Sequence, residues 1–327
     1  MVVEIWRAGH RPVLNTFQAL LRTRARGKRV VVAQRHKRKH TIFDKLQRLP
    51  GMELARMDDI AGCRLIFPSQ AELASFRSSL HAANFRHRRR NDDDKYDYIK
   101  NPKDTGYRGI HDIYEYDVNS ESGKGSKGLY IELQYRTGIQ HAWATAVEMI
   151  GVITDNHPKF QQGDKRYEEI MSYASEILAR SHENQNSCHP TISDDELLAA
   201  FLRLDDDLNL MTMLRKLNAR ASGGTEYRNM ILISSPNAPL DIRPFRNGTD
   251  ALKALFELER EDPNRDVVLV RADTSAEAHI AFRNYFTDPD EFIRLTEEGC
   301  QKLSGKSQVM AAHKPRRRKV MQQGSLF

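Results

Sequence analysis

The chain has 327 residues, a length that suits two domains, or one domain with a large extension, and that can bury a substantial core. Its composition, 39% hydrophobic and 29% charged residues, is that of an ordinary globular protein and excludes disorder as the main state. Lys and Arg number 51 against 44 Asp and Glu, so the formal net charge of +7 favours an anionic partner such as a nucleotide, RNA or an anionic lipid.

The N-terminal part of the chain predicts a helix, a basic segment, a strand and a second helix. Apolar residues recur at helical spacing over 13–26, and the segment 22–48 contains only one acidic residue, Asp44. Residues 63–67 have the apolar run of a short buried strand, and residues 70–81 have the spacing of an amphipathic helix.

A hairpin and two helices are predicted next. Residues 110–118 and 129–137 have the length and the β-branched or aromatic content of strands, and the polar, Gly- and Ser-rich residues 119–128 connect them. Helices are predicted over 139–150 and 163–183. We therefore expect an α/β (α+β) fold here, a mixed β-sheet of about five strands flanked by helices.

The helical pattern breaks after residue 183, and we expect a domain boundary near residue 188. Ser193 and Glu196 fit a capping box at the start of a further helix. Strands and helices then alternate over 230–234, 250–261, 266–270, 276–286 and 290–303. The predicted parts are a first domain over 1–188, a smaller α/β module over 189–304, and a basic, flexible tail over 305–327.

The sequence indicates neither a membrane protein nor a disulfide or zinc protein. No stretch reaches the roughly 18 apolar residues of a membrane span, and Glu4 and Arg7 stand where a signal peptide has its apolar segment. Cys63, Cys188 and Cys300 are odd in number and far apart, which argues against a disulfide framework and a zinc site. We therefore expect a cytoplasmic protein with no membrane partner.

The predicted strand over 129–137 has two unlike faces. Its apolar face carries Leu129, Ile131, Leu133 and Tyr135, and its polar face carries Tyr130, Glu132, Gln134 and Arg136. The polar face either lies in water, as in many antiparallel sheets, or lines a binding site.

Asp59 could bring a second carboxylate to that polar face. It stands with Asp58 just before the strand that carries Arg64, so it lies near Glu132 if the two strands share a sheet. Two carboxylates from neighbouring strands could hold a divalent cation and leave coordination positions for phosphate oxygens. Alternatively, Asp59 caps the following turn, which is a frequent role for Asp.

Two further segments have the composition of phosphate and base sites. Arg35, Lys37 and Lys45 lie in the basic segment, and an Arg fork with Lys point charges matches the dense charge of a triphosphate. The turn-rich residues 96–109 interleave tyrosines with Lys and Arg, and a base stacked on a tyrosine contributes about 1–3 kcal/mol in nucleic-acid systems. The alternatives are a solvated basic face and tyrosines that pack the loop onto the domain.

Five segments in order resemble the synthetase domain of the RelA/SpoT family, the alarmone synthetases, over about residues 35–183. They are RHKRKHTIFDKL, MDDIAGCRLIF, DYIKNPKDTGYRGIH, IELQYRT and HAWA. The resemblance implies a nucleotidyltransferase-like sheet, Mg²⁺ as cofactor, and transfer of the β,γ-pyrophosphate of ATP to the ribose 3′-hydroxyl of GDP or GTP.

The resemblance also implies roles for individual residues. ATP would be bound by Arg35, Lys37, Lys45 and Arg64. Asp59 and Glu132 would be the catalytic carboxylates and hold Mg²⁺, and Glu132 would also assist deprotonation of the attacking hydroxyl. The acceptor pocket would be lined by Lys103, Tyr107, His111, Gln134 and Arg136, with Tyr107 stacked on the base.

Some residues depart from the family pattern. Thr41 stands where the family commonly has Ser, and Gly109 replaces the usual Ser of a GYxSLH-like motif. After HAWA the chain reads TAVEMIGVIT instead of the pattern of the long bifunctional enzymes. About 34 residues precede Arg35, so we expect no built-in hydrolase domain. The departures leave the acceptor open.

Three functions are therefore considered. The first is synthesis of (p)ppGpp from ATP and GDP or GTP. The second is a toxic relative that pyrophosphorylates the tRNA 3′ end or an adenine nucleotide, with basic residues such as 86–90 making a tRNA or ribosome contact. The third is an RNA-binding protein with an inactive synthetase fold, against which the paired Asp59 and Glu132 argue. A homo-oligomer and a regulatory, binding or neutralising role of the C-terminal module are compatible with each.

Overall fold

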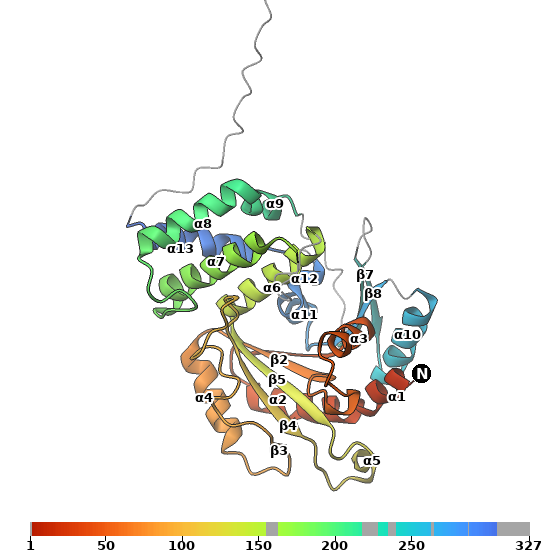
Figure 1. Cartoon of the computed structure of the whole chain (residues 1–327). Coiled ribbons are helices and arrows are strands. Elements are labelled where there is room, and N and C mark those ends of the chain that lie inside the picture. Colours follow the sequence, from red (N-terminus) through yellow and green to blue (C-terminus); the bar gives the residue numbers. More distant parts are fainter. Residues whose placement is uncertain are drawn as a thin grey trace, which may run out of the picture.

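The computed structural model describes residues 2–154, 163–217, 228–234, 240–262, 265–286 and 288–305. Within these ranges the strands form one eight-stranded sheet in the order β3-β4-β5-β2-β1-β8-β6-β7 (Figure 1). Neighbouring strands are antiparallel except β2 and β5, which are parallel. The strands are β1 (Val31–His36), β2 (Ala61–Phe67), β3 (Arg88–Arg89), β4 (Ile110–Glu115), β5 (Tyr130–Thr137), β6 (Asn229–Ser234), β7 (Asp241–Phe245) and β8 (Asp266–Arg271).

Helices cover both faces of this sheet. On one face α2 and α4 pack on the first five strands and α10 packs on β6 and β8; α11 and α12 pack on the other face, over β1, β6 and β8. The bounds are α1 (Val2–Gly9), α2 (Arg11–Ala25), α3 (Lys39–Arg48), α4 (Gln70–His81), α5 (Glu121–Lys124), α10 (Gly248–Glu261), α11 (Ser275–Ala281) and α12 (Arg283–Phe286), with a 3₁₀ turn at Leu54–Arg56.

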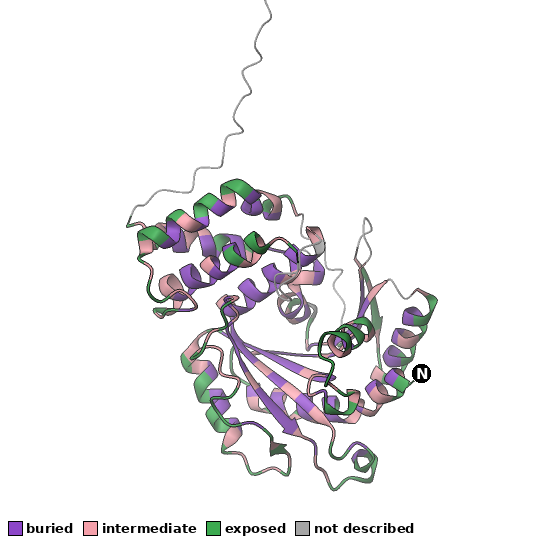
Figure 2. Cartoon of the chain, in the orientation of Figure 1, coloured by how far each residue is buried: buried purple, intermediate pink, exposed green. Residues whose placement is uncertain are grey.

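A separate layer of helices is built on α6, which follows β5 directly. It consists of α6 (Gly138–Ile153), α7 (Lys165–Glu183), α8 (Asp194–Leu208), α9 (Leu210–Arg215) and α13 (Asp290–Leu303), which share one apolar cluster. Figure 2 shows buried residues along the central strands and on the inner sides of these helices. None of the helices in the described part of the chain has both the length and the apolar character needed to cross a bilayer.

The fold class expected from the sequence is confirmed. The five strands before residue 188 belong to one mixed sheet, β4 and β5 form the predicted hairpin, and Ser193 and Glu196 form the capping box that begins α8. The sequence interpretation did not include β1, β3 or β7, and β3 has only the two residues Arg88–Arg89. The residues of β1, VVAQRH, lie inside the basic segment, and those of β7, DIRPF, contain a proline.

The C-terminal strands continue the sheet that the first five strands form. Strand β8 pairs with β1 through Gln34↔Arg271 and Arg35↔Val270. The reason is that β1 is bonded to β2 along one edge only, and β8 supplies partners for the backbone groups of its other edge. The boundary near residue 188 stays a prediction, and residues 306–327 of the predicted tail lie outside the described ranges.

Candidate active site

One face of the sheet gathers the polar side chains. The register pairs Arg35 with Gly62 and Gly62 with Glu132, so these positions share a face. By the same alternation, that face carries Arg35, Arg64, His111, Glu132, Gln134 and Arg136. It does not lie in water, because Arg64 and Arg136 are only 7% and 6% exposed. The polar face of β5 therefore lines a covered region of the molecule.

A pocket opens on this face between two carboxylates and several cationic groups. Its lining includes Arg35, Asp59, Gly62, Arg64, Glu132, Gln134 and Phe282. Asp59 accepts hydrogen bonds from Lys37 Nζ at 2.5 Å and from Lys45 Nζ, on α3, at 3.0 Å. Burial raises the pKa of the Asp59 carboxyl, but the two ammonium groups outweigh it and hold that pKa below its usual value. Lys37 and Lys45 thus form a cation cluster around the Asp59 carboxylate, of the kind that binds phosphate groups.

A chain of hydrogen bonds leads from Arg136 to the second carboxylate. Arg136 Nη2 donates to the Tyr107 hydroxyl at 3.0 Å, and the same hydroxyl lies 2.6 Å from His111 Nε2. His111 Nδ1 lies 2.8 Å from one oxygen of Glu132, and Gln134 Nε2 donates to the other at 2.6 Å. These residues come from β4, β5 and the loop before β4, so the hairpin register is what aligns them.

The electrostatic interactions within this series of hydrogen bonds favour the charged forms of His111, Glu132 and Tyr107. Burial alone would lower the pKa of His111, but Tyr107 and Glu132 raise it to about 9. Burial alone would raise the pKa of Glu132, but His111 and Gln134 hold it well below its ordinary value. Burial is likewise outweighed at Tyr107, where Arg136 and His111 lower the pKa to about 7. At neutral pH an imidazolium therefore lies beside an ionised Glu132.

An aromatic rim borders the network on the side of the loop. Lys103 Nζ lies 4.5 Å from the ring centroid of Tyr98 and 5.5 Å from that of Tyr107, and the two tyrosine centroids are 5.6 Å apart. Lys103 is exposed. The rim therefore offers ring faces and a mobile cation to a ligand that enters from solvent.

Gly109 explains one departure from the family pattern. A Cβ at this position would lie 3.1 Å from the Tyr107 hydroxyl and 3.3 Å from Cγ of Arg136, and φ is +155°. The backbone of the loop is therefore too close to the network for a larger residue without adjustment. The glycine in place of serine fits the tight packing of Tyr107 against Arg136.

The C-terminal part of the chain contributes to the pocket, which sequence reasoning missed. Phe282, between α11 and α12, lines the pocket. Arg64 Nη1 donates to the Ala281 carbonyl at 2.5 Å, and its guanidinium lies 5.7 Å from the Phe282 ring centroid. His141 bonds the neighbouring Ile280 carbonyl at 2.7 Å. No local sequence signal pairs these positions, because the contact joins segments that are far apart in the chain.

The basic residues at 86–90 are largely paired. Arg86 lies 3.4 Å from Asp117, Arg88 and Arg90 lie 2.7 and 3.2 Å from Glu115, and Arg89 pairs with Asp93. These acidic partners reduce the net positive charge that a tRNA contact at this edge would use. The basic run from His313 to Lys319 lies outside the described residues.

The donor set at the pocket fits Mg²⁺ by its chemistry. Asp59 and Glu132 line the same pocket and supply hard carboxylate oxygens. Among the residues that the structure describes, no three His, Cys, Asp or Glu gather as a complete metal centre. Mg²⁺ is commonly held by one or two carboxylates while waters and substrate phosphates fill its other positions. Two protein ligands are therefore enough for a site that forms with a nucleotide.

Comparison with known proteins finds similarity in the first part of the chain. Residues 34–150 match the model of the region found in RelA/SpoT proteins. The GTP pyrophosphokinase YjbM of Bacillus subtilis (strain 168) is 32% identical over 110 residues, which are 32% of this chain and 48% of that protein. The chain thus spans about half the length of this curated relative. All the residues expected to bind ATP, acceptor or Mg²⁺ lie within 34–150.

Solved structures of lower identity also match. The crystal structure of the small alarmone synthetase 1 from Bacillus subtilis is 23% identical, with a TM-score of 0.45, and covers 55% of this chain and 92% of that chain. A GTP pyrophosphokinase family protein from Streptococcus pneumoniae is 21% identical, with a TM-score of 0.43, and covers 61% of this chain and 96% of that chain.

Proposed function

We propose that the chain is a GTP pyrophosphokinase that makes (p)ppGpp, because residues 34–150 match the model of the region found in RelA/SpoT proteins. The reaction moves the β,γ-pyrophosphoryl group of ATP to the 3′-hydroxyl of GDP or GTP and releases AMP. The proposal rests on one observation above the others: the cation cluster at Asp59 and the hydrogen-bonded chain at Glu132 meet on one face of the sheet, with both carboxylates in one pocket.

The cation cluster suits the donor nucleotide. Lys37 and Lys45 converge on Asp59, and Arg35 lines the adjoining pocket. These cations would bind the ATP phosphates and stabilise the charge that develops on the transferred group. Mg²⁺ held by Asp59 and Glu132 would neutralise part of that charge.

The aromatic rim and Glu132 suit the acceptor. Tyr107 would stack on the guanine base, with Lys103 at the exposed edge and Arg136 behind the ring. His111 keeps Glu132 ionised, so that its carboxylate can accept the hydrogen bond of the attacking hydroxyl. The attacking hydroxyl of the acceptor and the phosphates of the donor would therefore meet at Glu132.

The test is a transfer assay with the full chain, Mg²⁺ and ATP labelled at the β- or γ-phosphate. GDP, GTP, ATP and deacylated tRNA are offered separately, and the products are resolved. We expect label on GDP or GTP. We also expect Glu132→Gln to lower the rate by at least about 100-fold, because the amide can neither accept the proton nor carry the charge.

A matched control separates this effect from a general loss of charge. Glu257→Gln changes an exposed carboxylate on α10, far from the pocket, and should leave the rate unchanged. Label found only on tRNA or ATP would replace the proposed acceptor, and transfer by Glu132→Gln at the wild-type rate would remove the proposed role of Glu132. RNA binding without any consumption of ATP would contradict an enzyme altogether.

A further inference from the structure

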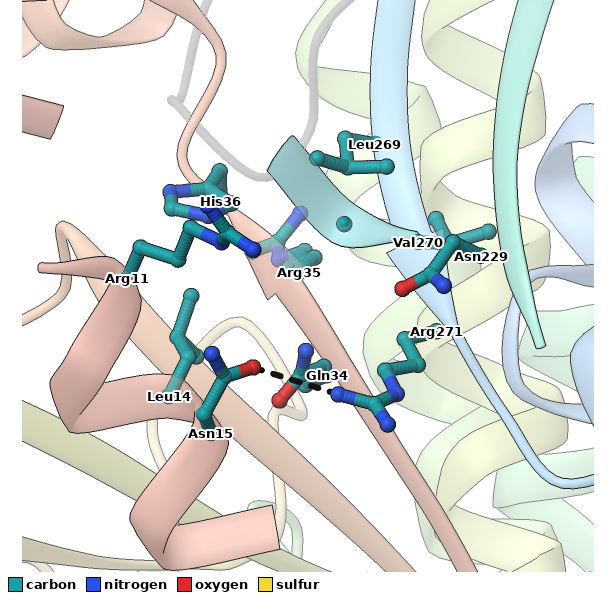
Figure 3. Close-up of a pocket in the computed structure, with 11 residues that line it drawn as sticks. Arg11, Leu14, Asn15, Gln34, Arg35, His36, Asn229, Leu269, Val270 and Arg271 are labelled. Atoms are coloured by element: carbon teal, nitrogen blue, oxygen red, sulfur yellow. Dashed lines mark hydrogen bonds between the residues drawn. The ribbon is translucent and has the colours of Figure 1, made fainter. Parts of the chain in front are cut away.

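A second pocket lies on the opposite face of the sheet, where the C-terminal strands join the first five. Figure 3 shows it between α2, β1 and β8, with the side chains of Arg11, Gln34 and Arg271 around it. Asn229 and Gly248, the first residue of α10, complete the side formed by the C-terminal part. The pocket is therefore assembled from both ends of the described chain.

The pocket carries positive charge without a matching carboxylate. Among the described residues, neither Arg11 nor Arg271 forms an ion pair, and Arg271 Nη1 donates instead to Oδ1 of Asn15 at 3.1 Å. The nearby arginines differ, because Arg7 is paired with Glu259 and Arg22 with Asp273. The two unpaired guanidinium groups are thus a local feature of the pocket.

The electrostatic cost of this arrangement is visible at Arg271. Burial and then the neighbouring cations, Arg22 first, lower its pKa from the ordinary value, and they outweigh Asp273, which acts in the opposite direction. An anion in the pocket would remove this repulsion, whereas a cation would increase it. The charge therefore selects for a negative ligand.

The pocket also contains buried polar atoms that bind nothing in the protein. Gln34 and His36 are 8% and 4% exposed, and Oε1 of Gln34, Nδ1 of His36 and Nε of Arg271 have no hydrogen-bond partner. All three residues line the pocket. Buried polar atoms without a partner are uncommon, so they indicate a missing ligand or water. Nε of Arg271 can donate to an oxyanion, whereas Oε1 of Gln34 only accepts and suits a water or a protonated oxygen of the ligand.

The first turn of α10 lies beside the same pocket. A Cβ on Gly248 would lie 3.6 Å from Nη2 of Arg11, so the guanidinium lies against this turn. The N–H groups of Thr249 and Asp250 already donate to Oδ1 of Asn247, and that of Ala251 donates to the Asn247 carbonyl. The donors that the pocket offers to an anion are therefore arginine side chains, whose forks match the oxygens of a phosphate.

We propose that this pocket is a binding site for a phosphate-type oxyanion, held by Arg11 and Arg271 and separate from the substrate site. The anion is either free phosphate or pyrophosphate, or the phosphoryl group of a nucleotide. The site is independent of the proposed transferase activity, because the side chains of Arg11 and Arg271, which would hold the anion, lie on the other face of the sheet.

The site has a direct route to the substrate pocket. Gln34 and Arg35 line both pockets, and Arg271 and Val270 are their partners in the β1·β8 pairing. An anion that joins α2 to β8 therefore fixes the strand from which Arg35 projects to the opposite face.

The test measures binding by the full chain with isothermal titration calorimetry, at constant ionic strength and without Mg²⁺. Phosphate, pyrophosphate and GMP are titrated separately, which distinguishes a free anion from a nucleotide. We expect Arg11→Ala and Arg271→Ala each to weaken binding at least tenfold. Arg271→Lys keeps the charge but loses the fork, and it supplies a second variant if Arg271→Ala does not fold.

Two controls locate the binding. Arg26→Ala removes one exposed charge at the end of α2 and should bind as the wild type does. The double change Lys37→Ala, Lys45→Ala removes cations from the substrate pocket and should retain binding at the second pocket. The proposal is overturned if binding disappears in this double variant but persists in Arg11→Ala and Arg271→Ala, or if the wild type binds none of the three ligands.

Discussion

The His111 imidazolium stabilises the anionic forms of Glu132 and Tyr107, and these anions stabilise the imidazolium, although burial alone would favour the neutral form of each group. The pKa of His111 is raised to about 9 and that of Tyr107 is lowered to about 7. The contribution of His111 to stability is fully present below its unfolded pKa of about 6.5 and is lost as the pH rises through about 9. Tyr107 has the opposite sign, since its contribution is lost as the pH falls through about 7.

We expect Tyr107→Phe to reveal the pH dependence of His111. In the wild type, Tyr107 and His111 change the free energy of unfolding in opposite directions as the pH rises, so their effects offset each other between about pH 7 and 9. Without the phenol, the free energy of unfolding should decrease as the pH rises above 6.5, because only the imidazolium beside Glu132 remains. Urea unfolding at pH 6, 7, 8 and 9 measures this. A variant whose stability stays as constant as that of the wild type would contradict the ion pair between His111 and Glu132.

At the scale of elements, the parts of the site that follow a local pattern were predictable. The alternation in β5 separates Glu132, Gln134 and Arg136 from the apolar face, and the structure uses both faces as that alternation indicates. The sequence also predicted the hairpin that brings His111 beside β5. These predictions were possible because the side chains of a strand alternate between its two faces with a period of two residues.

Other elements of the site have no local signal. Strand β1 was not predicted, because its residues VVAQRH lie in a strongly basic segment. It nevertheless carries Arg35 and pairs with both β2 and β8. The contact of Phe282 and Ala281 with Arg64 depends on how the C-terminal strands join the sheet. Such a long-range contact is decided by packing, and a single sequence does not reveal it.

Arg64 is expected to stabilise the turn between α11 and α12 in addition to contacting ATP. We expect Arg64→Ala to lower the free energy of unfolding by about 1–3 kcal/mol, because the Ala281 carbonyl loses its donor in a buried place. Lys45→Ala should cost less than about 1 kcal/mol, because Asp59 keeps Lys37. Both changes should raise the KM for ATP. Urea unfolding measures the stability of the two variants, and steady-state kinetics measures their KM for ATP. Equal stability of the two variants would contradict the role of Arg64 in stabilising the turn.

At the scale of the whole molecule, residues 34–150, which match the RelA/SpoT model, do not stand apart from the rest of the described chain. β8 continues their sheet, and α13 packs Phe292, Ile293 and Leu295 into the cluster of α6 and α7. A chain that ends at Leu217 would lose both contacts. It would expose the edge of β1 and the apolar sides of α6 and α7.

We therefore expect the fragment 1–217 to bind a hydrophobic dye and to elute as larger species in gel filtration. The fragment 1–305, which retains all the described elements, is the matched control and should behave as the full chain does. If fragment 1–217 unfolds in urea at the midpoint of the full chain and transfers pyrophosphate at the same rate, the C-terminal part is an independent attachment.

The position of β8 beside β1 also affects the order of events during synthesis. β1 leaves the ribosome early, but its partner on one side is complete only when Arg271 has emerged, and Phe282 follows still later. Until then, the nascent chain carries an open strand edge and a substrate pocket that lacks one wall. A chain interrupted by a premature stop codon before β8 would therefore be a substrate for chaperones and proteases, because its open edge and incomplete pocket would persist.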